Sequence, residues 1–137
     1  MNESLKELKK LAERVDKETA AMHAIAEFCN DGVWDWHLEE DYEYMSPRFW
    51  EILGYDYRKR EHHPKEWQSI IHPDDKKRAM DLFYVHAESK GKKPYVLSVK
   101  YAHPKDGWTN ILCRGKIIEW DEDEKPVRMI GTHTLLD

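Results

Sequence analysis

Apolar side chains in the first 29 residues recur in alternating steps of three and four, which is the spacing of one face of an α-helix. No Gly or Pro occurs before Gly32, and the good helix formers Leu, Lys, Glu and Ala dominate this segment. The sequence therefore predicts one amphipathic, coiled-coil-like helix over residues 1–29. Its apolar face includes Leu5, Leu8, Ala12, Val15 and Met22.

A free helix of this length is only marginally stable in water, so its apolar face must be covered. Two coverings fit the pattern: the helix folds back on its own domain, or it pairs with the same helix of a second copy. The heptad spacing favours the second, with the five residues just named as candidate dimer contacts. We expect a homodimer with a short or loosely packed contact, because Thr19 and Ala26 weaken the apolar face.

From Val33 onward the hydrophobic period changes to two, which is typical of half-buried strands. Strands are predicted over 33–38 and 42–45, then around 95–101, and finally over 108–120 and 127–136. Helix starts are indicated at Ser46-Pro47 and at His72-Pro73, because proline suits the first turn of a helix. The order of helix, two strands, helices and three strands predicts an α+β fold with one antiparallel sheet.

Composition narrows the class of protein. The chain has 137 residues, enough for one domain, and its 6 Trp, 7 Tyr and 3 Phe exclude a disordered chain. The net charge of −5 argues against a nucleic-acid partner, and no apolar run approaches the roughly 18 residues of a membrane span. The start lacks the apolar stretch of a secretory signal, and the two cysteines lie far apart, so a cytoplasmic location is expected.

Six ordered segments of the chain resemble motifs of the PAS domain family, of the variety with a PAC motif in its second half. They are Asp31-Gly32-Val33-Trp34-Asp35-Trp36, Ser46-Pro47-Arg48 through Leu53-Gly54-Tyr55, Ile71-His72-Pro73-Asp74-Asp75, Lys105-Asp106-Gly107, Arg114-Gly115 and Pro126-Val127-Arg128-Met129-Ile130-Gly131-Thr132-His133-Thr134.

The resemblance implies a five-stranded antiparallel sheet with short helices on one face, in a PAS domain over 30–137 that follows the helix of 1–29. It also implies sensing: such domains bind a small molecule or a partner and pass a change to a flanking helix. They usually belong to larger proteins such as histidine kinases, diguanylate cyclases or transcription regulators. An effector kinase or cyclase is not expected within this chain, and neither is an enzyme activity.

A cavity between sheet and helices is the expected ligand site. The candidate lining residues are apolar or aromatic, with a few polar groups among them: Phe49, Leu53, Leu82, Phe83, His86, Val99, Tyr101, Leu112, Ile130 and Thr132. Such walls suit a small apolar or aromatic ligand. The alternative is a core that large side chains fill completely. Two functions follow from these alternatives: a ligand-binding sensor that acts through helix dimerisation, or a cofactor-free scaffold that joins two chains.

The sequence gives less support to a known cofactor or a catalytic site than to a small apolar or aromatic ligand. The cysteine motif of the family's flavin photosensors is absent, which argues against a flavin adduct, and haem would depend on His86 alone. His62, His63 and His72 lack partners at ligand spacing, so no metal is expected. Asp74 and Asp75 occupy a first helical turn, where carboxylates mostly face water, and no catalytic motif accompanies them.

Overall fold

The computed structural model describes the backbone of residues 2–136, and their side chains except at 2, 11, 12 and 14–16. The helix α1 (Asn2–Phe28) precedes the strands β1 (Gly32–His37) and β2 (Tyr42–Met45). Four short or medium helices follow: α2 (Pro47–Glu51), the 3-10 turn η1 (Tyr57–Lys59), α3 (Lys65–Gln68) and α4 (Pro73–Glu88). The chain ends with β3 (Tyr95–Ala102), β4 (Trp108–Trp120) and β5 (Pro126–Leu135).

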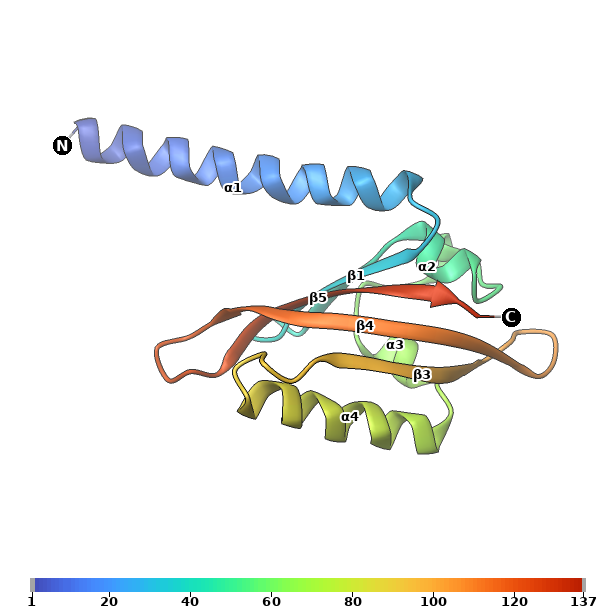
Figure 1. The fold of residues 1–137 in the computed structure, drawn as a ribbon. Helices are drawn as coiled ribbons and strands as arrows, with labels where there is room; N and C mark the ends of the chain where they lie inside the picture. The colour runs from blue at the N-terminus through green and yellow to red at the C-terminus, as the bar shows by residue number, and fades with distance from the viewer. Residues whose placement is uncertain (1, 137) are drawn as a thin grey trace.

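The five strands form one antiparallel sheet in the order β2-β1-β5-β4-β3. The last strand lies between the first and the fourth, so the two ends of the domain meet in the middle of the sheet. In Figure 1, α4 and α1 lie on opposite sides of the strands, and Phe49 and Trp50 of α2 and Trp67 of α3 belong to or pack against the core. The predicted α+β fold with five antiparallel strands is confirmed, including the N-terminal helix.

Two predicted helix starts act as expected, and each joins its helix to the sheet. The Ser46 hydroxyl accepts a hydrogen bond from Phe49 N of α2 at 3.2 Å and another from Val33 N of β1 at 2.9 Å. At α4, His72 Nδ1 accepts a hydrogen bond from Asp74 N at 3.1 Å. A capping side chain satisfies backbone donors that the first helical turn leaves free.

The expectation that Asp75 faces water is wrong. Asp75 is buried, and its Oδ2 accepts a hydrogen bond from the backbone N of Lys100 in β3 at 2.7 Å. The Arg78 guanidinium donates to Oδ1 at 2.9 Å. Burial by itself raises the pKa of Asp75, but these two hydrogen bonds outweigh it and hold the pKa below its usual range. Asp75 thus fastens α4 to the sheet as a carboxylate.

The sheet face beneath the short helices, here called the inner face, carries the core. The β3 side chains Tyr95, Leu97, Val99 and Tyr101 are buried on it. Gly115 and Gly131 are paired across β4 and β5 under the Trp34 indole, and a Cβ at either glycine would overlap the ring. The two glycines therefore let Trp34 lie directly on the backbone of the sheet.

Candidate ligand cavity

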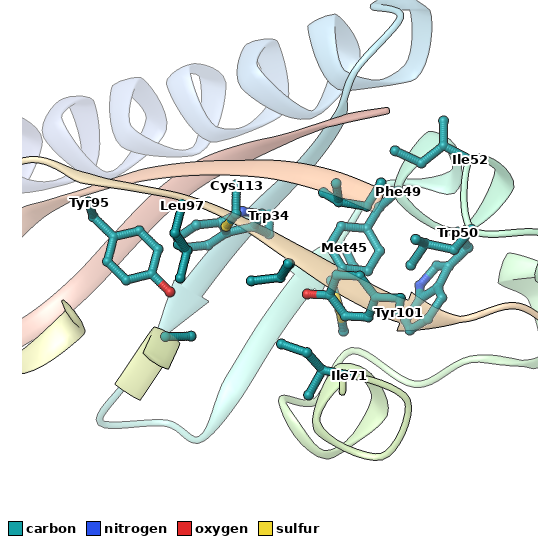
Figure 2. Close-up of a cluster of buried hydrophobic side chains, with 14 of the residues drawn as sticks. Trp34, Met45, Phe49, Trp50, Ile52, Ile71, Tyr95, Leu97, Tyr101 and Cys113 are labelled. Carbon is teal, nitrogen blue, oxygen red and sulfur yellow. The ribbon is translucent and has the colours of Figure 1, made fainter. Parts of the chain in front are cut away.

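A cavity of about 50 Å³ lies between the inner face and the helices α3 and α4. Seven aromatic side chains contribute to its walls: Trp34, Trp36, Phe49, Trp67, Phe83, Tyr95 and Tyr101. Ile71, Ala79, Met80, Leu97, Val99, Cys113, Met129, Glu43 and His133 complete the lining. Several of these side chains, including Tyr95, Leu97, Trp34 and Tyr101, are drawn in Figure 2. An apolar cavity of about 150 Å³ holds benzene, so this smaller space suits only a ligand of a few heavy atoms or ordered water.

Of the ten lining residues predicted from the sequence, the structure brings Phe49, Phe83, Val99 and Tyr101 to the cavity. Leu53 is fully buried in the core but does not line the cavity. Leu82 lies toward the surface instead, beside Val85 of α4 and Val96 of β3. Helix α4 therefore faces the cavity with Ala79, Met80 and Phe83.

The expected inward orientation of Leu112, Ile130 and Thr132 is wrong. Cys113 of β4 and Met129 and His133 of β5 line the cavity, and successive side chains of a strand point to opposite faces. Leu112, Ile130 and Thr132 consequently lie on the outer face, the side of the sheet that α1 occupies in Figure 1.

His86 is buried but lies outside the cavity lining, which corrects its assignment to the pocket. Its Nδ1 lies 2.7 Å from the carbonyl oxygen of Lys93, and its Nε2 accepts a hydrogen bond from the backbone N of Ile117 at 3.1 Å. Both ring nitrogens are thus engaged with the backbone. Because neither nitrogen is available to iron in this arrangement, the haem alternative has no axial ligand at this position.

Glu43 is a polar lining residue that the sequence reasoning missed. It is 4% exposed, and its Oε1 accepts a hydrogen bond from Trp67 Nε1 at 2.9 Å. Burial raises the pKa of Glu43 to about 8, although the Trp67 hydrogen bond opposes the shift. At neutral pH the cavity therefore contains an uncharged carboxylic acid.

His133 is the second missed polar residue. Its ring stacks on Phe49 with 4.4 Å between centroids and meets Tyr101 at 5.5 Å. Burial lowers the pKa of His133 to about 3, so the imidazole is neutral. Its Nδ1 is buried and forms no hydrogen bond with the described residues, whereas the neighbouring Trp34 indole lies within reach of the Cys113 thiol, a weak acceptor. Buried polar atoms without partners are uncommon and point to a missing partner such as a ligand or water.

Hydroxyl and thiol groups add further polar atoms. Tyr95 and Tyr101 stand near opposite ends of β3, and Figure 2 shows their phenol oxygens directed along the strand toward one another. Burial raises the pKa of Tyr95, Tyr101 and Cys113, so all three remain protonated at neutral pH. The cavity thus offers several neutral hydrogen-bonding groups inside aromatic walls.

A signal for some of the missed residues is present in the sequence. Tyr95 and Leu97 belong to the same alternating run as Val99 and Tyr101, so their inward orientation follows from strand periodicity. Glu43 had no such signal, because a glutamate between Tyr42 and Tyr44 has the pattern of a solvent-facing position.

The N-terminal helix touches the rest of the molecule near its C-terminal end. Ala26 is fully buried, and the His23 ring stacks on Tyr44 of β2 with 3.8 Å between centroids. His23 Nε2 also lies 3.8 Å from the buried Asp35 carboxylate. Among the predicted dimer contacts, Leu5 and Leu8 are exposed and Met22 is half-buried, while the side chains of Ala12 and Val15 lie outside the described residues.

Within the described residues, no three His, Cys, Asp or Glu side chains are arranged to hold a metal ion. Two of the histidines considered as ligands bond to the backbone instead: His62 Nδ1 accepts from Met45 N, and His63 Nδ1 accepts from Lys65 N. None of the described helices combines the length and the apolar character that crossing a membrane requires.

A model of the PAS fold family matches residues 42–133. This chain belongs to the PAS family. A comparison with curated proteins finds no match. The family and the sheet described above define a sensory domain of the kind found in histidine kinases and cyclases.

Solved structures show the same architecture. A sensory box histidine kinase/response regulator from Burkholderia thailandensis is 25% identical, with a TM-score of 0.67, and the match covers 84% of this chain and 83% of that one. The N-terminal domain of a diguanylate cyclase with a PAS/PAC sensor from Marinobacter aquaeolei is 14% identical, with a TM-score of 0.62 and coverage of 77% and 94%. A PAS domain from Colwellia psychrerythraea is 14% identical, with a TM-score of 0.65 and coverage of 89% and 97%.

Proposed function

We propose that this PAS domain is a signal-transduction module that binds a small ligand in its inner cavity and signals through α1. The observation that carries the proposal is His133 Nδ1, a buried polar atom of a cavity-lining residue that has no hydrogen-bond partner among the described residues. A core that side chains merely fill has no use for such an atom, because it costs free energy until something bonds to it. A ligand with hydrogen-bonding groups supplies the missing partner.

The transmitting element in this proposal is α1, within a layout of a flanking helix over 1–29 and a sensor domain over 30–137. Support comes from the position of His23, which stacks on the outer face of β2 while Glu43 of the same strand lines the cavity on the inner face. A ligand that shifts β2 therefore also shifts the surface against which α1 rests. The exposed Leu5 and Leu8 support a second copy as the partner of α1.

The alternative is a cofactor-free scaffold that only joins two chains through α1. The observation that favours it is the small cavity volume of about 50 Å³. The two functions differ in one measurable respect, because only the sensor changes its stability when a small molecule is added. A ligand that binds the folded state alone raises the apparent stability by RT ln(1 + L/Kd), where L is its free concentration, so the effect grows with the logarithm of that concentration.

A thermal-shift screen of the full chain against small metabolites tests the proposal. We expect at least one compound to raise Tm, and we expect the Ala79→Met variant to lose this response because the longer side chain fills the cavity next to Phe83. Ala20→Met on the exposed surface of α1 is the matched control and should respond like the wild type. If no compound shifts Tm, or if Ala79→Met responds unchanged, the sensor proposal fails and the scaffold remains.

A further inference from the structure

Glu43 is a buried carboxyl group whose side chain has only one hydrogen-bond partner among the described residues, the indole of Trp67. Its other surroundings are apolar or neutral, because none of the residues that line the cavity is a lysine or arginine. A buried acid in proteins is ordinarily paired with a cation, since burying an ionised group without a partner is costly. The cavity therefore contains a buried acid with no cationic partner among its lining residues.

The walls around Glu43 favour a positive charge. Trp36, Trp67 and Tyr95 are among the seven aromatic side chains that line the cavity. The face of an aromatic ring carries negative partial charge and attracts a cation, and this attraction is strongest where water is excluded. The one other group of the lining that could become cationic, His133, stays neutral because burial lowers its pKa to about 3.

The volume limits the size of the cation. A space of about 50 Å³ accepts a few heavy atoms and excludes a fused-ring compound without rearrangement. A metal ion does not fit the chemistry, because no group of three ligating side chains is found among the described residues.

We propose that the cavity binds a small organic cation of the alkylammonium class, with ionised Glu43 as its counter-ion and the aromatic side chains as its cage. The proposal rests on the proposed function and specifies the ligand of the same site. Its proton balance is simple: the Glu43 carboxyl releases its proton to solvent when the cation binds, and Trp67 Nε1 continues to donate to the carboxylate.

The proton released by Glu43 gives the proposal a specific signature. Below a pH of about 8 the acid must first lose its proton, so the affinity for a cation rises with pH and becomes constant above the pKa. Between pH 6.5 and pH 8.5 the expected gain in affinity is roughly 20-fold for a group with this pKa. A neutral ligand of the same size shows no such gain.

The test uses methylammonium, which is charged throughout this range, and methanol as its neutral match. Binding to the full chain is followed by NMR chemical shifts of the tryptophan indole groups at pH 6.5, 7.5 and 8.5. We expect methylammonium to bind more tightly as pH rises and methanol to bind weakly at every pH. Equal affinity for the two probes, or a methylammonium affinity that does not change with pH, overturns the proposal.

Two variants distinguish the effect of the Glu43 carboxyl on cation binding from the effect of an exposed carboxylate. Glu43→Gln keeps the shape and the acceptor for Trp67, and it should abolish both the preference for methylammonium and its pH dependence. Glu51→Gln, on the exposed surface of α2, is the matched control and should leave both unchanged. If Glu43→Gln does not fold, the pH dependence of the wild type still decides the question. A neutral or anionic compound as the best ligand in the thermal-shift screen overturns this inference while the sensor function stands.

Discussion

The position of Glu43 between an indole and a wall of aromatic rings has a consequence for stability. Burial raises the pKa of its carboxyl group from 4.5 to about 8 in the folded protein, whereas the unfolded chain exposes the group to water. The folded state therefore binds the proton more tightly than the unfolded state. A group of this kind stabilises the fold fully below pH 4.5, and its contribution is lost as pH rises toward 8.

We predict that Glu43→Gln removes this part of the pH dependence. Relative to the wild type, the variant should gain stability between pH 5 and pH 8, by up to a few kcal/mol. Urea unfolding at several pH values, followed by tryptophan fluorescence, measures the difference. The exposed Glu51→Gln variant provides the baseline, and a stability difference for Glu43→Gln that stays constant from pH 5 to pH 8 would contradict the burial argument.

At the scale of elements, α1, β1 and β5 meet at one buried carboxylate. Asp35 of β1 is fully buried, and the Arg128 guanidinium of β5 binds both its oxygens, at 2.9 and 2.7 Å. His37 Nε2 lies 3.3 Å and His23 Nε2 of α1 lies 3.8 Å from the same carboxylate. The hydrogen bonds from Arg128 to Asp35 also raise the pKa of the guanidinium. The junction between the helix and the sheet thus depends on a charge that must stay paired.

We predict that Arg128→Ala destabilises the fold by about 3 kcal/mol, because it leaves the Asp35 charge buried without its main partner. Arg128→Lys should lose less, since it keeps the charge but not the two-pronged geometry. Arg114→Ala, an exposed arginine on β4, serves as the control and should change stability by less than about 0.5 kcal/mol. Denaturant unfolding gives these values, and an Arg128→Ala loss no larger than that of the control would contradict the role assigned to the pair.

The sequence predicted the elements well and the faces of the last two strands poorly, for one physical reason. On β3 the positions from Leu97 to Tyr101 alternate between apolar and polar, so Val99 and Tyr101 were assigned inward correctly. On β4 and β5 both faces carry apolar residues, as Leu112 beside Cys113 and Ile130 beside Met129 show. Periodicity cannot orient such a strand. The orientation follows from a long-range fit, in which Gly115 and Gly131 must face Trp34.

Polar residues of the cavity were harder to predict than apolar ones. Glu43 and His133 are buried because tertiary packing encloses them, and neither type is ordinarily buried without a partner. His86 shows the opposite case: its ring nitrogens bond to the backbone, at Lys93 in the loop before β3 and at Ile117 in β4, instead of meeting a ligand. Whether a polar side chain meets a ligand or the backbone depends on contacts that no local pattern contains.

At the scale of the whole molecule, α1 runs as one long helix on the outer side of the sheet (Figure 1). Its 27 residues span about 40 Å at the usual rise per residue. The contacts described above involve its C-terminal end, at His23 and Ala26, while Leu5 and Leu8 remain exposed. An isolated helical segment gains too little from its own hydrogen bonds to persist in water, so the N-terminal part of α1, whose leucines are exposed, needs a partner.

We predict that this partner is α1 of a second copy, and that Leu5→Glu with Leu8→Glu converts a dimer into a monomer. Two buried charges of the same sign in each helix oppose pairing along the apolar face. Ala20→Glu with Ala24→Glu adds the same charge at exposed positions off that face and should leave the dimer intact. Sedimentation velocity over a range of concentrations measures the association. A monomeric wild type, or a leucine variant that dimerises as tightly as the wild type, would exclude α1 as the dimer contact and with it the route by which the cavity is proposed to signal.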